Sequence, residues 1–374
     1  MSRRKAIKKA IKRDRLLMLT FGVLTVISLG VAGWQITVTG GPDPTTYTEI
    51  SVTPRQHGTV SIAFAGDTMF ADGAADLIAA QGVEATLSGV AGVFREADVA
   101  VVNMESPITL HTVSFFPGAQ LTYFAPLEAA DALAAIGVNV FQLGNNRVLD
   151  LGPLGLADTI ENAAHVGIVT VGAGFNRTEA IRPLLIRTEG LTVALISFGE
   201  NFGAARRAGD NAPGMVPFTG RAVVQAERIA RNVGADRVIA LAHWGDNYKS
   251  EITDEQWYWA AELVAAGYDA VIGTGPHVLQ PVEVINGVPV VFSIGNFVFT
   301  TWGRFELVGA PSLGAVATIS FDADGGTLSL QCINPDNKIV NFVPRECDEN
   351  EAILAANELK GGLEWQGSIG TLHF

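Results

Sequence analysis

The sequence predicts an α/β fold preceded by one N-terminal transmembrane helix, and three observations carry this prediction. From residue 59 onward, short β-rich runs alternate with helical stretches, which is typical of an open α/β sheet. Later in the chain, strands follow one another quickly through turns such as Asn286-Gly287, which favour antiparallel hairpins. Near the start, an apolar stretch lacks any charged side chain. We therefore expect a membrane helix, an α/β sheet and added antiparallel strands, in that order.

The apolar stretch covers residues 16–38, which is long enough to cross a bilayer, since a crossing takes about 20 apolar residues. Residues 1–15 before it contain eight basic side chains and one acidic side chain. The positive-inside rule keeps this basic tail in the cytoplasm and sends the chain after Val38 outside. We expect a retained single-pass anchor. A signal peptide cut near Gly30-Val31-Ala32 and a buried core helix are the alternatives.

The composition favours a globular chain and argues against nucleic-acid binding. Hydrophobic residues make up 48% of the chain and charged residues 17%, which suits a buried core. The net charge is -13 although the tail is strongly basic, so the remainder is more acidic still and would repel phosphate backbones. Residues 39–58 are rich in Gly, Pro and Thr and are expected to be a linker. Residues 59–345 would form the main domain, and 346–374 a C-terminal extension.

Hydrophobic periodicity and turn residues give the expected elements. Helical segments are expected over residues 74–97, 126–136, 153–164, 221–233 and 254–266. Strands are expected over residues 60–65, 99–103, 138–143, 169–172, 191–198, 238–242, 270–273, 282–285, 288–294, 315–321 and 327–333.

Polar motifs follow five of the apolar runs. They are Gly66-Asp67, Asn103-Met104-Glu105, Gly144-Asn145-Asn146-Arg147, His243-Trp244-Gly245 and Gly275-Pro276-His277. Ligands and metals gather at the carboxyl ends of strands in an open α/β sheet, so we expect these motifs to converge. Carboxylates, amides and imidazoles are common ligands of divalent cations. A helix cap at Asp67 and a simple turn at Asn145-Asn146 are the structural alternatives.

Two other groups of residues have open interpretations. Cys332 and Cys347 are the only cysteines, and they predict either a disulfide in an oxidising compartment or two buried thiols. Trp257, Tyr258 and Trp259 stand together at the start of an expected helix. They would form either a partner-docking patch, because Trp and Tyr are favoured at interfaces, or ordinary core packing.

The order of the motifs resembles that of the bacterial capsule-synthesis (CapA) family over roughly residues 60–299. The matching stretches are Ala65-Gly66-Asp67, Val102-Asn103-Met104-Glu105-Ser106, Gly144-Asn145-Asn146 with Leu149-Asp150, Ala242-His243-Trp244-Gly245, Pro276-His277-Val278-Leu279-Gln280-Pro281 and Ser293-Ile294-Gly295-Asn296-Phe297. The resemblance implies a relation to calcineurin-like metallophosphoesterases and a four-layer α-β-β-α sandwich. It also implies a domain anchored in the bacterial inner (cytoplasmic) membrane, periplasmic or extracellular, that acts in capsule or poly-γ-glutamate assembly.

The same resemblance implies a metal or anion site. A divalent Mn, Fe or Zn ion is the candidate ligand, and a site without metal is the alternative. Together with the strand-end motifs, the resemblance gives the expected site residues, which are Asp67, Asn103, Glu105, Asn146, His243 and His277. The chain departs from the family pattern where it has Arg147 and Gly275 in place of two histidines. Arginine does not give up a proton near neutral pH and does not bind a cation, and glycine offers no ligand. We expect Arg147 to pair with Glu105 or Asp67.

These departures leave two functional hypotheses. The first is a CapA-like surface-polymer protein, with its hydrolase activity and catalytic residues left open, that binds an anionic polymer or a phosphoester. The second is a non-catalytic assembly subunit of a bacterial membrane protein complex. A weaker third hypothesis is an anion-binding module in which Arg147 replaces a metal.

Overall fold

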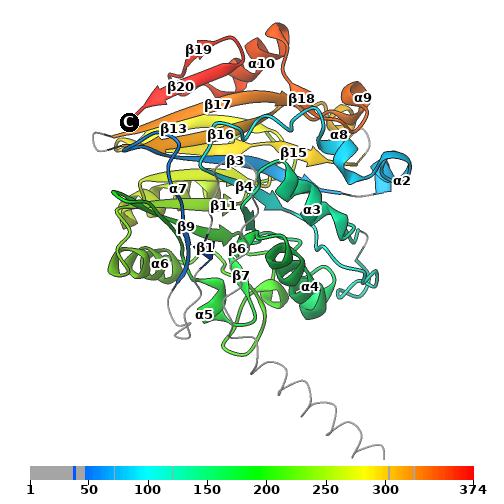
Figure 1. The fold of residues 1–374 in the computed structure, drawn as a ribbon, viewed down its shortest axis with the longest axis horizontal. Coiled ribbons are helices and arrows are strands. Elements are labelled where there is room, and N and C mark those ends of the chain that lie inside the picture. Colours follow the sequence, from blue (N-terminus) through cyan, green and yellow to red (C-terminus); the bar gives the residue numbers. More distant parts are fainter. Residues whose placement is uncertain (1–36, 39–46, 71, 120, 302–303, 323–324) are drawn as a thin grey trace, which may run out of the picture.

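Two large β-sheets pack face to face in the computed structural model, which describes residues 37–38, 47–70, 72–119, 121–301, 304–322 and 325–374 (Figure 1). The first is an eight-stranded sheet. In spatial order its strands are β1 (Thr37–Val38), β2 (Thr48–Ser51), β8 (Leu184–Arg187), β9 (Thr192–Gly199), β11 (Arg237–His243), β12 (Ala270–Thr274), β14 (Val288–Ile294) and β13 (Leu279–Ile285). Strands β9, β11, β12 and β14 are parallel neighbours.

The second sheet has ten strands. They are β19 (Glu364–Gln366), β20 (Ile369–His373), β17 (Gly326–Asn334), β16 (Gly314–Phe321), β3 (Val60–Met69), β4 (Val99–Met104), β5 (Val140–Gln142) and β6 (Val169–Val171), with β15 (Asn296–Phe299) beside β3 and β18 (Arg345–Glu346) beside β17. Strands β3 to β6 are parallel, whereas β16, β17 and β20 are antiparallel. A short pair, β7 (Ala173–Gly174) and β10 (Gly214–Met215), stands apart.

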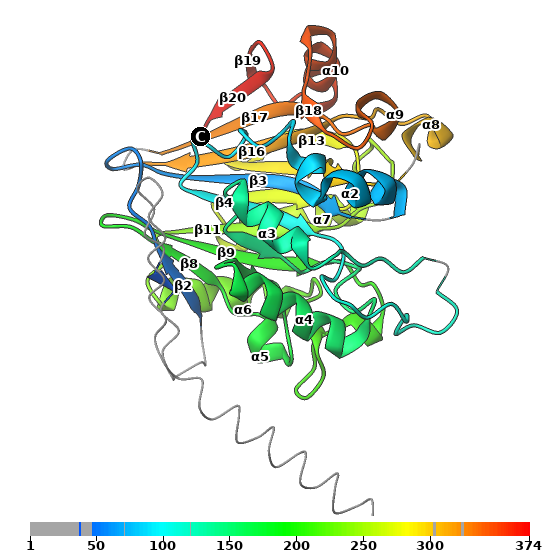
Figure 2. The same cartoon turned by 45° about the vertical axis from the view of Figure 1, so that its right-hand side comes forward.

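Helices cover the outer face of each sheet (Figures 1 and 2). The helices of the described residues are α2 (Ala75–Gln81), α3 (Glu128–Ala135), α4 (Gly152–His165), α5 (Arg177–Ala180), α6 (Gly220–Asn232), α7 (Asp254–Ala266), α8 (Arg304–Val308), α9 (Asn337–Val340) and α10 (Glu349–Leu359), with 3-10 turns at Asp72–Ala74, Val83–Leu87 and Ala204–Arg206. Helix α10 differs from those on the outer faces, because its Ala355 and Leu359 pack into the core between the sheets. One apolar core lies between the sheets, a second lies under α3 and α4, and a third lies under α6 and α7. The layers therefore run helix, sheet, sheet, helix.

Local sequence signals explain where some helices begin and end. Thr253 starts α7 with a capping box, in which its side chain accepts from the Gln256 N–H and the Gln256 side chain accepts from the Thr253 N–H. Gly267 ends the helix in a left-handed conformation, so α7 has the bounds that the sequence predicted. The helical stretch expected over 74–97 is instead broken into α2, a 3-10 segment and turns. Gly82, with φ of 83°, ends α2 there because glycine adopts this backbone without strain.

Most of the expected anchor, residues 16–38, lies outside the described residues. Its last two residues, Thr37 and Val38, form strand β1 and pair with Ser51 and Ile50. In the described part of the chain, no helix combines the length and the apolar character that a membrane crossing requires.

Both segments expected to flank the main domain contain strands of the two sheets. The segment expected as a linker contains β2. This strand pairs with β8, and its Ile50 is buried in the core between the sheets. The expected boundary at residue 345 falls inside β18. The segment beyond it extends the ten-stranded sheet with β19 and β20, so it is part of the same packed body.

The two cysteines form a disulfide, which resolves the open alternative in favour of a bond. Cys332 in β17 and Cys347 after β18 are bonded, with 5.4 Å between their Cα atoms.

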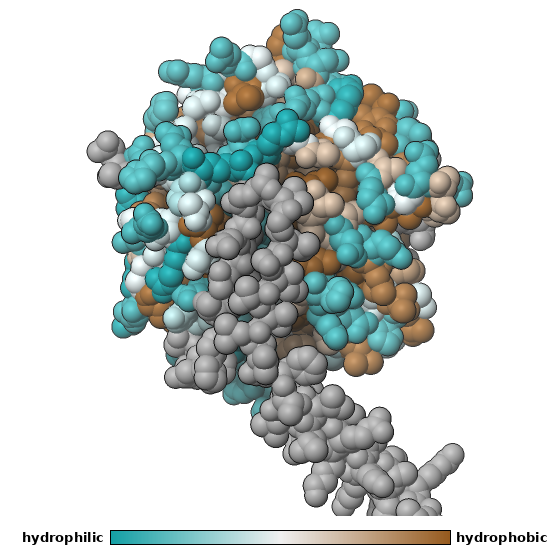
Figure 3. All heavy atoms as spheres, viewed as in Figure 1, coloured by the Kyte–Doolittle hydropathy of each residue, from teal (hydrophilic) through white to brown (hydrophobic). Residues whose placement is uncertain are grey.

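Figure 3 shows hydrophilic side chains over the C-terminal strands, whereas apolar side chains gather at its lower right, over α4 and the loop before α3. Leu110, Val113 and Leu154 are among the exposed apolar residues of that region.

Candidate functional site

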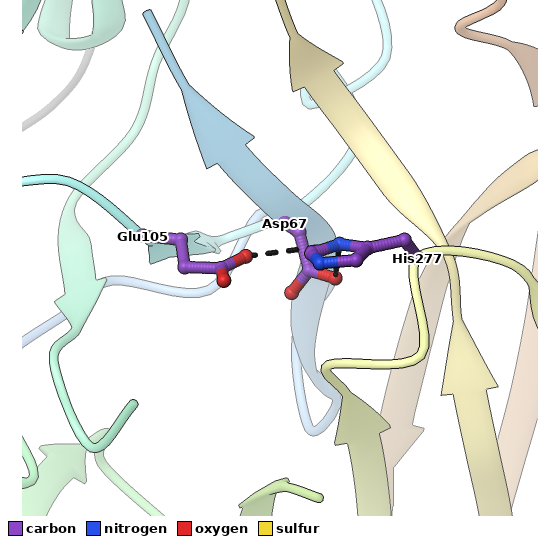
Figure 4. A group of neighbouring side chains, drawn as sticks. All are labelled: Asp67, Glu105 and His277. Atoms are coloured by element: carbon purple, nitrogen blue, oxygen red, sulfur yellow. Dashed lines mark ion pairs between the residues drawn. The ribbon is translucent and has the colours of Figure 1, made fainter. Parts of the chain in front are cut away.

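The candidate site lies where parallel strands of both sheets end. Asp67 of β3 pairs in register with Asn103 of β4, and His243 is the last residue of β11. His277 follows β12 and has a φ of 63°, a left-handed value that costs energy for a non-glycine residue. Glu105 comes directly after β4 and points toward Asp67 and His277 (Figure 4). The predicted convergence of the strand-end motifs is thus observed.

Asp67 is fully buried and accepts several hydrogen bonds. Asn103 Nδ2 donates to Asp67 Oδ1 at 2.7 Å, and the backbone N–H of Gly275 reaches both carboxylate oxygens at 3.2 Å. His277 Nδ1 lies 2.9 Å from Asp67 Oδ2. Burial by itself would raise the pKa of Asp67, but the two nearby histidines outweigh it and hold this pKa below its usual value. Asp67 therefore stays ionised at the centre of the site and does not cap a helix.

Glu105 is the other buried carboxylate of the site. Its Oε1 lies 3.9 Å from His243 Nε2 and its Oε2 lies 3.8 Å from His277 Nδ1, which is too far for hydrogen bonds. Glu105 Oε2 is buried without a hydrogen-bond partner in the described residues. Burial raises the pKa of Glu105 to about 8. This side chain thus has an unsatisfied oxygen that a cation would compensate.

The two histidines differ in their electrostatic state. Burial lowers the pKa of His243 to about 4, so this ring is neutral at pH 7. Asn103 Nδ2 lies 3.0 Å from His243 Nδ1, and because the amide is a donor, His243 accepts there and carries its proton on Nε2. Burial also opposes the charge of His277, but the carboxylates of Glu105 and Asp67 outweigh burial and raise its pKa.

Asn145, not Asn146, joins the hydrogen-bond network. Asn145 Nδ2 donates to Asn103 Oδ1 at 3.0 Å and to the Met104 carbonyl at 2.9 Å. The side chain of Asn146 makes no hydrogen bond to the site within the described residues, and its buried Oδ1 lacks a partner. Both amides stand at the same strand end, so the sequence could indicate the position but not which of two neighbours turns inward.

Arg147 pairs with neither Glu105 nor Asp67, contrary to the sequence expectation. Its Nη1 donates to Asp150 Oδ2 at 3.1 Å, and its guanidinium lies over the ring of Tyr123 at 4.6 Å from the centroid. Arg206 Nη2 lies 3.5 Å from the other oxygen of Asp150. Asp150 is nearer in sequence and only 3% exposed, so a pair with it compensates a buried carboxylate. Asp150 lies in a stretch that matches the family pattern, but the sequence did not indicate that Asp150 and Arg206 would be neighbours of the site.

Gly275 has a structural role at the site. Its φ is 110°, and a Cβ built on it would lie 2.6 Å from the carbonyl oxygen of Trp244. A histidine at this position would therefore be strained in the present backbone. The residue contributes its N–H to Asp67 instead of a side-chain ligand.

The donor set fits a divalent cation. Asp67, Glu105 and His277 each offer one ligand atom, and these three atoms all lie within 4.8 Å of one another. Mixed carboxylate and imidazole ligands suit Mn, Fe or Zn, and the unpaired Glu105 Oε2 is the oxygen that an ion would satisfy.

The aromatic group on α7 lies away from this centre and is divided between packing and exposure. Trp257 is 40% exposed and its ring lies 4.9 Å from that of Phe292, whereas Trp259 stacks on Phe218 at 5.2 Å. Tyr258 is 54% exposed. Core packing thus accounts for Trp259 and part of Trp257, and the docking role stays a prediction.

Two solved structures illustrate a distant likeness of fold. A calcineurin-like phosphoesterase from Bacillus subtilis aligns with a TM-score of 0.46 and 17% identity, over 76% of this chain and 95% of that one. A NAD nucleotidase from Haemophilus influenzae aligns with a TM-score of 0.45 and 12% identity, over 81% of this chain and 62% of that one.

Sequence comparison gives closer relatives. The chain is 29% identical over 247 residues to the PGA biosynthesis protein CapA of Bacillus subtilis (strain 168), covering 66% of this chain and 65% of that protein. It is 26% identical over 305 residues to the capsule biosynthesis protein CapA of Bacillus anthracis, covering 80% and 72%. A probable polyglutamine synthesis accessory protein of Mycobacterium tuberculosis is 30% identical over 251 residues, covering 63% and 65%. The chain thus matches slightly less than two thirds of the Bacillus subtilis relative.

The family model described as bacterial capsule synthesis protein PGA_cap matches residues 61–301, which is more than half of the chain. This match confirms the resemblance inferred from the order of the strand-end motifs. The chain belongs to the bacterial capsule synthesis protein family PGA_cap.

Proposed function

We propose that this chain is an accessory protein of capsule or poly-γ-glutamate-type surface-polymer assembly, whose buried centre holds a divalent cation. Family membership supports the polymer role. The ion is proposed from the buried cluster of Asp67, Glu105 and His277, in which Glu105 Oε2 has no hydrogen-bond partner among the described residues. A bound Mn, Fe or Zn ion would supply a Lewis acid that attracts an oxygen of an anionic ligand. The ligand would be an acidic polymer or a phosphoester.

We propose further that the centre binds and does not hydrolyse. Arg147, at the strand end where the family resemblance leads us to expect a histidine, keeps its protons at neutral pH and so cannot act as a general acid or base. Its guanidinium is also committed to Asp150 and Tyr123. The neutral His243 is held by Asn103 and Thr274. This arrangement supports the assembly role over a working phosphoesterase.

The proposed location is the outer side of the bacterial inner membrane, with residues 16–38 as the anchor. The uncharged segment and the basic tail before it support this orientation. The disulfide between Cys332 and Cys347 supports an oxidising compartment. The test is alkaline extraction of membranes followed by protease treatment of spheroplasts. Resistance to extraction together with cleavage from outside is expected, and release by alkali would contradict the anchor.

The polymer role is tested by deleting the gene in the bacterium that encodes it. Surface polymer is then quantified after acid hydrolysis, with and without the full chain restored. We expect loss on deletion and recovery on restoration, and unchanged polymer would contradict the role.

Hydrolysis is tested on the purified full chain in detergent, loaded with Mn²⁺, Fe²⁺ or Zn²⁺, with bis(p-nitrophenyl) phosphate as the probe. We expect the wild type to be no faster than Asp67→Asn, because the centre lacks a proton-transferring group at position 147. Turnover that depends on Asp67 and survives in Glu200→Gln would contradict the non-catalytic proposal. Glu200 is a suitable control, since it is a partly buried carboxylate that binds the Gly245 N–H and not the cluster.

A further inference from the structure

We infer that the centre holds one divalent ion per chain, and that the cationic cluster of Arg147, Asp150 and Arg206 disfavours a second ion beside it. This inference shares with the proposed function the claim that an ion binds at the centre. Its new content is the number of ions bound and the residues that limit that number.

The acceptor positions of Asp67 limit the number of ions. A carboxylate offers about four lone-pair positions. The amide of Asn103 and the N–H of Gly275 already take three of them, two on Oδ1 and one on Oδ2. These donors are fixed by the backbone and by the amide network. The remaining position on Oδ2 faces His277 Nδ1 at 2.9 Å, so Asp67 can serve one ion there and cannot bridge two.

His243 Nδ1 is not free to bind a second ion. Its Nδ1 is held by Asn103 at 3.0 Å and by Thr274 Oγ1 at 3.2 Å, and its Nε2 faces Glu105. Gly275 brings only its N–H to the site and leaves no room for a side-chain ligand.

A fixed positive charge stands at the strand end where Asn145 joins the site. The backbone N–H of Arg147 donates to Asn145 Oδ1 at 3.0 Å, and Arg206 Nε donates to the Asn146 carbonyl at 2.7 Å. Arg147 and Arg206 share the single carboxylate of Asp150, at 3.1 and 3.5 Å, so this cluster carries one excess positive charge. The charge of Arg147 acts on both Glu105 and His243. Tyr123 and Phe116 lie under the two guanidinium groups at 4.6 and 3.9 Å, which holds both arginines in place.

Charge balance also indicates that the centre binds one ion. When an ion displaces the proton of Glu105, the carboxylates of Asp67 and Glu105 together neutralise one divalent charge. A second ion would leave two uncompensated positive charges in a buried site that already faces Arg147. Buried charge without a counter-charge is strongly unfavourable.

The first experiment measures capacity. The full chain is purified in detergent, stripped with a chelator and titrated with Mn²⁺ by equilibrium dialysis, and its electron paramagnetic resonance spectrum is recorded at saturation. One Mn²⁺ per chain with an uncoupled six-line spectrum is expected. Two per chain with an exchange-coupled spectrum would overturn this inference and leave the ion centre intact. No bound Mn²⁺ would overturn the ion centre itself, and this inference with it.

The second experiment tests the charge of the cluster. Arg147→Gln keeps a polar side chain near Asp150 but removes the cation, so Mn²⁺ should bind about 3- to 10-fold more tightly, an advantage that shrinks as salt rises. Arg237→Gln is the control, because Arg237 lies at the opposite end of β11 and should change affinity little. Equal or weaker binding in a folded Arg147→Gln protein would overturn the electrostatic part.

Discussion

At the residue scale, Gly275 illustrates how structure changes the meaning of a motif. From the sequence it counts as a lost ligand. In the structure its N–H donates to both oxygens of Asp67, and its backbone lies against Trp244 in a left-handed conformation. A glycine at this strand end therefore supports the site through its backbone, which no residue pattern alone discloses.

Gly275→Ala should destabilise the fold. A φ of 110° is costly for alanine, and its Cβ would lie 2.6 Å from the Trp244 carbonyl oxygen. We expect the free energy of unfolding to fall by roughly 1–3 kcal/mol or more. Urea unfolding measures it, with Gly190→Ala as the control, since no atom of the described residues lies within 4 Å of a Cβ there. Equal stability of the two variants would contradict the close approach.

The ion-free protein should lose stability as pH rises from 6.5 to 8. Glu105 has a folded pKa of about 8 against 4.5 unfolded, so the folded chain binds the extra proton and stability falls as that proton leaves. His277, with a raised pKa, acts in the same direction. His243 acts in the opposite direction, but only between pH 4 and 6.5, because its folded pKa is about 4.

Over this interval we expect a loss of roughly 1–2 kcal/mol in the free energy of unfolding. Urea unfolding in a chelator at pH 6.5 and 8 measures it. Glu105→Gln should reduce the slope, and so should Mn²⁺, which replaces the proton. A slope equal in wild type and Glu105→Gln would show that Glu105 does not carry the effect.

At the element scale, the disulfide fastens the C-terminal elements to the ten-stranded sheet. Cys332 in β17 and Cys347 close a loop with a sequence separation of 15. Reduction should lower the free energy of unfolding by about 2–4 kcal/mol, because the unfolded chain regains its freedom. Denaturant unfolding with and without a reductant measures this. Identical midpoints, with full reduction verified by thiol labelling, would contradict a stabilising bond.

Helix α7 separates packing from exposure within three consecutive residues. Trp259→Ala should lower the free energy of unfolding by about 2–3 kcal/mol, since its ring stacks on Phe218. Tyr258→Ala, at a position 54% exposed, should change it by less than about 0.5 kcal/mol. Comparable losses in both variants would mean that Tyr258 also belongs to the packed core.

At the scale of the whole molecule, the sequence predicted the features that depend on hydrophobic periodicity and turn residues, namely the fold class and the bounds of several elements. Helix α7 and strand β14 have their predicted bounds, and the strand-end motifs converge as expected. What it could not predict depends on contacts between distant segments. The salt bridge of Arg206 to Asp150 joins residues from different loops, and the choice of Asn145 over Asn146 depends on how one loop turns.

The boundaries of the main domain show the same limit. Residues 48–51 and 346–374 were expected to lie outside the main domain. In the structure, β2 of the first segment pairs with β8, and β20 of the second pairs with β17. Strand pairing of this kind depends on backbone hydrogen bonds that composition does not encode.

Anomalous X-ray diffraction from crystals of the Mn²⁺-loaded full chain, recorded at the manganese edge, tests the central claim most directly. The account predicts one peak per chain, between Asp67, Glu105 and His277, with Arg147 still bound to Asp150. No peak at this position, or two peaks side by side, would contradict the account of a single-ion centre.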